Sequence, residues 1–206
     1  MDEKQIENLK AIAPNVIDEN GCVKPFVEQL TDYALGVMPE GEVFVVSESI
    51  HPIHSQLTGG MPLVLSQHGA AKAAAALGIS LKEFGDLPKW LENHPLVAES
   101  ITSPNAVTLF IDVAGTKSSE KTAALTIDKS PVNGAYELSP NVTSLDPEKG
   151  LTTLLENSAK LGACIYVNSR TKSWLESIGK KLPAHTSGQI FNESDGSLIA
   201  RNNDLD

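Results

Sequence analysis

Two groups of polar residues in this sequence could do chemistry. The first is His68 and Lys72, in the stretch SQHGAAK at 66–72. If a helix begins here, the two side chains lie one turn apart on the same face. The partial positive charge of a helix N-terminus favours neutral imidazole, which can act as a general base, and the adjacent cation can stabilise a phosphorane. The alternative is a half-exposed histidine at a helix start, followed by a solvated lysine.

The second group follows the apolar run ACIYVN at 163–168, where a strand is expected to pass into a helix. Such a turn presents free backbone N–H groups, and an arginine beside it can clamp an anion. Arg170 is therefore a candidate phosphate clamp and Asn168 a candidate orienting residue. The alternative is an ordinary strand-end cap formed by Asn168 or Ser169. Ser144, in a polar segment after Tyr136, could bind phosphate or close a turn.

The sequence predicts neither a metal nor an organic cofactor. His51 and His54 lie in the Pro- and Gly-rich segment SIHPIHSQLTGG, which is typical of a loop, and no third ligand stands near them. Cys22 and Cys164 are far apart, and we expect two buried free thiols rather than a zinc site or a disulfide framework. No P-loop, G-x-G-x-x-G, G-x-S-x-G or H-E-x-x-H motif is present.

The secondary structure that the sequence predicts around these residues differs between the first and the second part of the chain. The first part reads as helices, and the second as strands with a helix between them. Ser80 and Glu83 have the spacing of a capping box, and Pro88 should kink or restart the helix that follows. The sequence thus predicts an α+β fold, with N-terminal helices followed by a small, mainly antiparallel sheet with flanking helices. Helices are expected at 3–12, 25–36, 69–77, 80–94, 147–161 and 170–182, and strands at 42–49, 107–114, 121–128, 136–145 and 163–168. Residues 63–66 could form a short strand or the last apolar turn before a helix.

Composition and charge limit the classes of function. The chain has 206 residues and a net charge of −10. Residues 1–50 hold ten acidic residues against three lysines, a net charge of −7, and the remainder carries −3. An acidic protein disfavours non-specific binding to nucleic acid, although the nearly neutral remainder still permits a local basic cleft. No signal peptide and no membrane-spanning stretch is recognised, so we expect a cytoplasmic protein that does not bind membranes.

We expect three parts: an acidic helical segment with one strand at 1–50, an α+β core domain at 51–185, and a polar tail at 186–206. The tail should form a frayed hairpin or be disordered.

The order of several short motifs resembles the phage MuF C-terminal domain, a family found at the ends of phage head-morphogenesis and polyvalent proteins. The resemblance covers about residues 60–180. One departure is Ser169, which stands where the family pattern has a lysine. The matching positions are Gly60 with Pro62, His68, Lys72, Leu87-Pro88 with Leu91 and Pro95, Ser100, Asp112, and Tyr166-Val167-Asn168.

The resemblance implies an element order similar to that of the barnase–EndoU–RelE-like ribonucleases, which cut RNA without a metal. It implies a phage- or mobile-element-associated effector, with His68 as general base or acid, Lys72 as charge stabiliser, Arg170 as phosphate clamp, and Asn168 and Ser144 as orienting residues. RNA would then be the partner, and a phage-encoded protein would be located in the host cytoplasm or in the virion. Two alternatives remain open: a non-enzymatic phage structural or host-interaction module that docks through the acidic N-terminal segment, and an acidic inhibitor of a basic partner.

Overall fold

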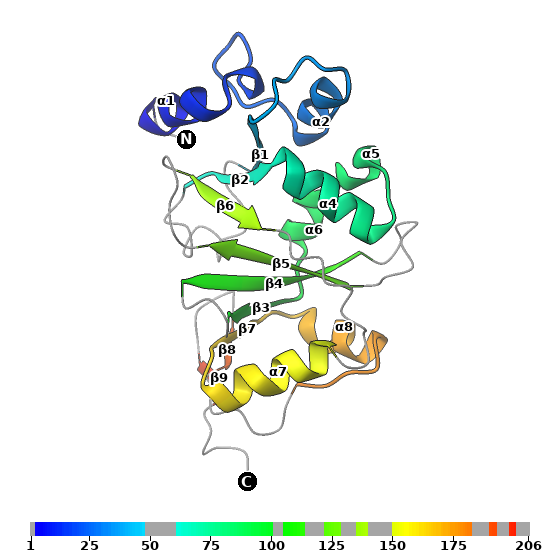
Figure 1. Ribbon diagram of the computed structural model, residues 1–206. Coiled ribbons are helices and arrows are strands. Elements are labelled where there is room, and N and C mark those ends of the chain that lie inside the picture. The colour runs from blue at the N-terminus through cyan, green and yellow to red at the C-terminus, as the bar shows by residue number, and fades with distance from the viewer. Residues whose placement is uncertain are drawn as a thin grey trace.

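The computed structural model describes residues 3–47, 61–100, 105–113, 122–128, 135–139, 150–182, 190–192 and 198–200. Within these residues the fold is α+β, as predicted: N-terminal helices precede a mainly antiparallel sheet with flanking helices (Figure 1). The helices are α1 Glu3–Ile12, the 3-10 helix η1 Pro14–Val16, α2 Phe26–Ala34, α4 Gln67–Leu77, α5 Leu81–Phe84, α6 Leu87–Glu92, α7 Gly150–Leu161 and α8 Thr171–Ser177. The strands are β1 Val43–Ser47, β2 Leu63–Ser66, β3 Leu96–Glu99, β4 Ala106–Asp112, β5 Thr122–Asp128, β6 Tyr136–Ser139, β7 Ile165–Val167, β8 Ile190–Asn192 and β9 Leu198–Ala200.

The described strands form one hydrogen-bonded sheet in the order β1-β2-β6-β5-β4-β3-β7-β8-β9. Pairing is antiparallel except at two places, β2 with β6 and β7 with β8. Following the directions across the sheet, β2, β6, β4 and β7 run the same way. The carboxyl ends of these strands therefore point to the same end of the sheet. The candidate residues near 66 and 168 follow two of these strand ends.

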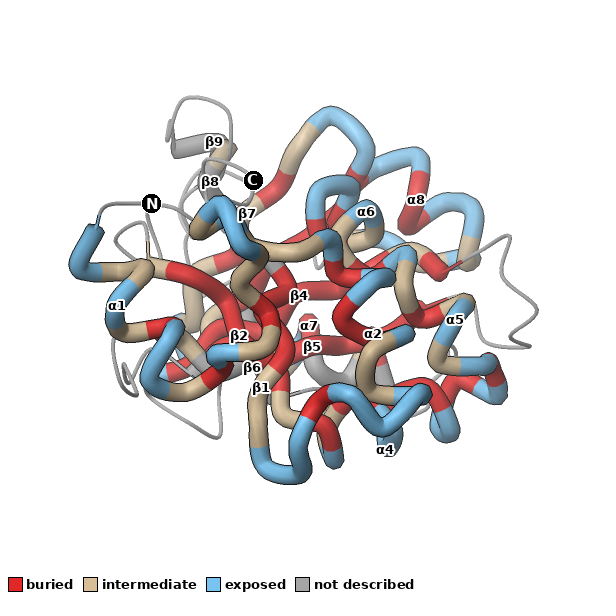
Figure 2. Tube along the Cα trace, turned by 90° about the horizontal axis from the view of Figure 1, so that it is seen from above, coloured by how far each residue is buried: buried red, intermediate tan, exposed pale blue. Residues whose placement is uncertain are grey.

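The central strands are buried on both faces. In β4, Val107, Leu109 and Ile111 belong to one apolar cluster, while Phe110 belongs to a second cluster on the opposite face. This division follows the alternation of side chains along a strand. It explains why β4 reads as an almost unbroken apolar run, AVTLFID, and why the tube of Figure 2 is red along β4 and β5.

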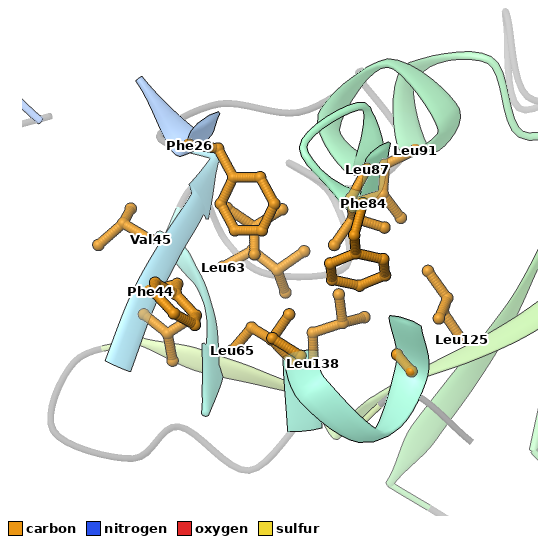
Figure 3. Packing of buried hydrophobic residues seen from close by; sticks show 14 of the residues in the cluster. Phe26, Phe44, Val45, Leu63, Leu65, Phe84, Leu87, Leu91, Leu125 and Leu138 are labelled. Carbon is orange, nitrogen blue, oxygen red and sulfur yellow. The ribbon is translucent and has the colours of Figure 1, made fainter. Parts of the chain in front are cut away.

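The two clusters differ in size and in the helices that cover them. The large cluster takes side chains from α1, α2, α4, α5 and α6, and Figure 3 shows part of its packing. The small cluster takes side chains from α7 and α8. Members of the large cluster include Leu9, Leu30, Phe26, Phe44, Leu65, Phe84, Leu87, Leu91, Leu109 and Leu125. The described members of the small cluster are Leu96, Ala98, Phe110, Ala124, Leu151, Leu155, Ile165, Val167, Trp174 and Leu175.

Two buried glutamines fasten the N-terminal segment to the sheet. The Gln29 amide accepts from the backbone N–H of Val45 at 2.8 Å and donates to the Val45 carbonyl at 2.9 Å, so α2 is joined to strand β1. Gln67, the first residue of α4, donates to the Pro39 carbonyl at 2.7 Å and accepts from the Gly41 N–H. The Gln29 amide thus satisfies backbone groups of buried Val45 that would otherwise lack partners, and the Gln67 amide ties the 39–41 turn to the start of α4.

Several sequence predictions need correction. Strand β3 was not predicted, because LVAE is only four residues long and directly follows a helix ended by Pro95. Helix α4 begins at Gln67 rather than 69, because Ser66 is its N-cap. The helix expected at 170–182 ends at Ser177. Cys22 is exposed rather than buried, although both cysteines are free, as predicted.

The capping box of Ser80 and Glu83 is present, and the chain forms α5 and then α6 around Pro88, as predicted. The predicted boundaries after residues 50 and 185 lie outside the described residues. Among the described helices, none is both long and apolar enough to span a bilayer.

Candidate functional site

His68 and Lys72 lie in the first two turns of α4, next to its N-cap. The Ser66 hydroxyl accepts from the Gly69 N–H at 3.1 Å, which fixes the start of the helix. Both His68 and Lys72 are exposed. Neither side chain makes a hydrogen bond or an ion pair to the described part of the chain, so nothing there orients them for proton transfer. Within the stretch SQHG, the residues with a structural role are Ser66 and the buried Gln67.

The Asn168 side chain forms hydrogen bonds that join two turns of the fold. Its amide donates to the His94 carbonyl at 2.8 Å and accepts from the Arg170 N–H at 2.9 Å. The hydroxyl of Thr171, a buried residue, accepts from the Asn168 N–H and donates to the Pro95 carbonyl. The turn between β7 and α8 is thereby tied to the turn between α6 and β3. These bonds give the Asn168 side chain a structural role at the strand end.

Arg170 extends from the same turn toward the end of α6. One guanidinium nitrogen, Nη1, donates to the Asn93 side-chain oxygen at 2.7 Å and, at 3.5 Å, to the Asn93 carbonyl. A guanidinium has five N–H donors. The described residues leave the other donors of this exposed side chain without partners, so Arg170 is positioned by Asn93 and can still bind an anion.

Beside Arg170 the surface is hollowed into a pocket of ≈ 210 Å³, which we call the Arg170 pocket. Its walls come from the end of α6, the start of β3, the end of β4 and one face of α8. Ser173, Trp174 and Ser177 follow Arg170 at helical spacing. The lining residues are Asn93, Pro95, Asp112, Arg170, Ser173, Trp174 and Ser177.

Trp174, which lines this pocket, carries a buried polar group without a hydrogen-bond partner among the described residues. The residue is only 6 % exposed, and the group is its indole Nε1. Buried N–H groups in folded proteins nearly always have partners. The hydroxyls nearest in sequence are occupied as donors, since Ser173 donates to the Arg170 carbonyl and Ser177 to the Trp174 carbonyl.

The structure brings Arg170 and Asn168 together, but the Arg170 pocket is lined by neither His68 nor Lys72. Strand β2, which leads to His68, and strand β7, which leads to Arg170, are five positions apart in the sheet. At the usual spacing of about 4.8 Å between strands, this separation is roughly 24 Å. Ser144 lies outside the described residues.

Sequence reasoning missed the partners of Arg170. Asn93 is 77 positions away in the chain, and Trp174 was not predicted as a residue of the site. The spacing of Arg170, Ser173 and Ser177 along one face of α8 was the available signal, because these residues recur every three to four positions.

A second surface with a distinct character lies on the N-terminal helices. Val27 is 48 % exposed, Leu35 is 72 % exposed and Val37 is 56 % exposed. Glu28, also on α2, is exposed as well. We call the exposed residues of this segment the N-terminal surface; they also include the acidic residues Glu3, Glu7, Glu19 and Glu40.

One lysine of this region is already engaged. Lys24 pairs with Asp32 at 2.7 Å, and this hydrogen bond raises the pKa of Lys24 above its usual 10.5. The pair uses the only lysine in the described stretch between residues 11 and 47. The other acidic residues of that stretch share this one lysine, which also interacts electrostatically with Glu28 and Asp18.

No group of three or more histidine, cysteine, aspartate or glutamate side chains that could hold a metal occurs among the described residues. Comparison with family models, with curated proteins and with solved structures finds no match to this chain.

Proposed function

We propose that the protein is a non-enzymatic interaction module that binds a basic partner protein through its N-terminal surface. The observation that carries this proposal is the combination, on one segment, of net negative charge with large exposed apolar side chains. Val27, Leu35 and Val37 offer apolar area, and the exposed acidic residues of the same segment select a basic partner. The resemblance to the phage MuF C-terminal domain suggests a phage or host protein as that partner.

The proposal also accounts for the exposed His68 and Lys72. The ribonuclease hypothesis needs a base, a cation and a phosphate clamp around one scissile bond, within hydrogen-bonding reach of the reacting atoms. Strand order works against this, because β2 and β7 are separated by four other strands. An interaction module makes no such demand on these side chains.

The experiment compares two variants that change the net charge by the same amount. The first, Glu7→Gln/Glu19→Gln/Glu28→Gln, neutralises the N-terminal surface; the second, Glu92→Gln/Glu156→Gln/Glu176→Gln, neutralises exposed residues elsewhere. Binding to a lysine-rich amphipathic peptide of about 20 residues is measured by calorimetry at two salt concentrations. We expect the first variant to weaken binding at least tenfold and the second less than twofold. Equal losses in both variants would show that net charge alone attracts the peptide, and would overturn the proposal.

The metal-independent ribonuclease is kept as a second candidate because Arg170 retains unused guanidinium N–H groups beside a pocket. Its test is cleavage of a structured RNA by the wild-type protein and by His68→Ala, each with and without EDTA. On the interaction-module proposal, neither protein cleaves RNA. EDTA-resistant cleavage that disappears in the variant would establish His68 as catalytic and would reverse the order of the two candidates.

A further inference from the structure

Charge is unevenly distributed over the described residues. Residues 3–47 hold eight acidic residues against three lysines, a net charge of −5. Residues 150–182 hold four lysines and one arginine against two glutamates, a net charge of +3. Since the chain as a whole carries −10, the second stretch is a local basic region of an acidic protein.

The acidic and the basic stretch lie at opposite ends of the sheet. Buried Gln29 joins α2 to β1, the first strand in the order, whereas α7 and α8 flank β7 in the sequence, the seventh strand. Six strand spacings of about 4.8 Å amount to roughly 29 Å. Figure 1 shows α1 and α2 at one end of the molecule and α7 and α8 at the other. The two ends of the protein therefore carry opposite charge.

The basic end presents exposed cations. Lys160 lies at the end of α7, Arg170 and Lys172 lie at the start of α8, and Lys181 follows α8. All four are exposed, and none of them forms an ion pair with another described residue. Leu161, next to Lys160, is 70 % exposed. We call these five residues the basic surface.

The exposed apolar side chains are found on the same two surfaces. Among the described residues, the large apolar side chains that are exposed are Val27, Leu35 and Val37 on the N-terminal surface and Leu161 on the basic surface. Apolar area combined with charge of opposite sign is the complementarity that protein interfaces use. The net charge of −10 opposes self-association, but at physiological salt charges are screened within about 8 Å, so facing side chains outweigh distant ones.

We propose that the N-terminal surface of one molecule binds the basic surface of a second copy of this chain, head to tail. This inference rests on the proposed function, and it names the basic partner as a second copy. Because the two surfaces differ and lie at opposite ends, each contact leaves one surface of each kind free. Such a heterologous contact grows by further addition and does not stop at a dimer.

The experiment measures the weight-average mass by light scattering and sedimentation, over a range of concentrations and at two salt concentrations. One variant neutralises each surface, and a third removes three exposed lysines from α4, α5 and α6 as the matched control. The variants are Glu7→Gln/Glu19→Gln/Glu28→Gln for the N-terminal surface, Lys160→Gln/Lys172→Gln/Lys181→Gln for the basic surface, and Lys72→Gln/Lys82→Gln/Lys89→Gln for the control.

We expect the wild-type mass to rise as the concentration passes about 0.1 mM, because contacts between small charged surfaces are weak. Association should fall at least threefold between about 0.1 M and about 0.5 M salt. Each surface variant should remain monomeric, whereas the control should associate like the wild type. The decisive step mixes the two surface variants. Each retains the surface that the other lacks, so the mixture should form a heterodimer and nothing larger.

Thermal unfolding of each variant is recorded first, so that a loss of association is separated from a loss of fold. A wild-type protein that remains monomeric but binds the lysine-rich peptide would overturn this inference and leave the proposed function standing; if the peptide also fails to bind, both are overturned. A wild-type mass that stops at a dimer would overturn the head-to-tail contact. Association that persists in both surface variants, or a mixture that forms no heterodimer, would overturn it as well.

Discussion

Among the described residues, the α-helices that contribute to the large cluster are α1, α2, α4, α5 and α6, whereas those that contribute to the small cluster are α7 and α8. On the large-cluster side, buried Gln29 and Gln67 use both ends of their amides on backbone groups of neighbouring segments. On the small-cluster side, the sheet borders the Arg170 pocket, whose lining residue Trp174 has an indole N–H without a partner among the described residues. The large-cluster side thus uses buried side-chain amides to hold segments together, whereas the small-cluster side contains a buried polar group that the described residues leave unsatisfied.

The largest effect should come from breaking either cluster. Phe110 is fully buried in the small cluster and Phe84 nearly so in the large one. We expect Phe110→Ala and Phe84→Ala each to lower the free energy of unfolding by about 3–5 kcal/mol, because each leaves a cavity. The measurement is urea unfolding followed by far-UV circular dichroism.

The same experiment tests whether the two faces unfold together. Strands β3, β4 and β5 carry residues of both clusters, so each variant should still unfold in a single transition. Two separate transitions in Phe110→Ala would show that the small cluster is an independent unit. Phe110→Leu is the conservative control and should lose less than about 1.5 kcal/mol.

An intermediate loss of stability should come from replacing the buried polar side chains that connect separate segments by hydrogen bonds. Gln29→Ala leaves the N–H and C=O of buried Val45 without partners and should cost about 2–3 kcal/mol. Thr171→Val removes the hydroxyl that donates to the Pro95 carbonyl and should cost roughly 1–3 kcal/mol. The control is Thr31→Val, an exposed position on α2, which should change stability by less than about 0.5 kcal/mol. If Gln29→Ala behaves like this control, the join does not fasten α2 to the sheet.

The smallest effect concerns the ion pair of the N-terminal region. The Lys24 and Asp32 side chains are 22 % and 21 % exposed, so the pair should contribute no more than about 1 kcal/mol. Since the folded-state pKa of Lys24 is raised, this contribution is fully present below pH 10.5, the ordinary lysine value, and is lost as the pH rises through the raised pKa.

We therefore expect Lys24→Met to be less stable than the wild type between pH 7 and pH 9, and the difference to disappear at strongly alkaline pH. Lys89→Met removes a more exposed pair, in which Lys89 and Asp86 are 75 % and 55 % exposed, and should have no measurable effect. Urea titrations at three pH values check both variants. A Lys24→Met difference that grows with rising pH would contradict the assignment.

The sequence predicted local features well, since these depend on neighbouring residues. The box of Ser80 and Glu83, the break at Pro88 and the paired strands β4 and β5 all follow from short patterns. Strand β3 was missed because four residues are too few to show a period, and its position between β4 and β7 depends on tertiary pairing. Gln29 was missed for the same reason, because the Val45 backbone that it binds is 16 positions away.

The candidate site shows the same limit. Arg170 was predicted as an anion clamp from its place after a strand, and its exposed position beside a pocket is compatible with that role. The groups that surround it come from the end of α6 and the end of β4, which no local pattern connects to residue 170. Conversely, the spacing of His68 and Lys72 places them on one face of a helix. That spacing does not show which residues of other elements lie near them in the fold.

The join between Gln29 and Val45 has a consequence for solution behaviour. Strand β1 is a terminal strand of the sheet, and one face of its backbone would otherwise present free N–H and C=O groups. Such groups are a template on which another chain can add a strand. A fragment that begins after α2 would lose the amide that covers this edge. Proteolysis between α2 and β1 should thus increase the tendency of the protein to self-associate strand by strand.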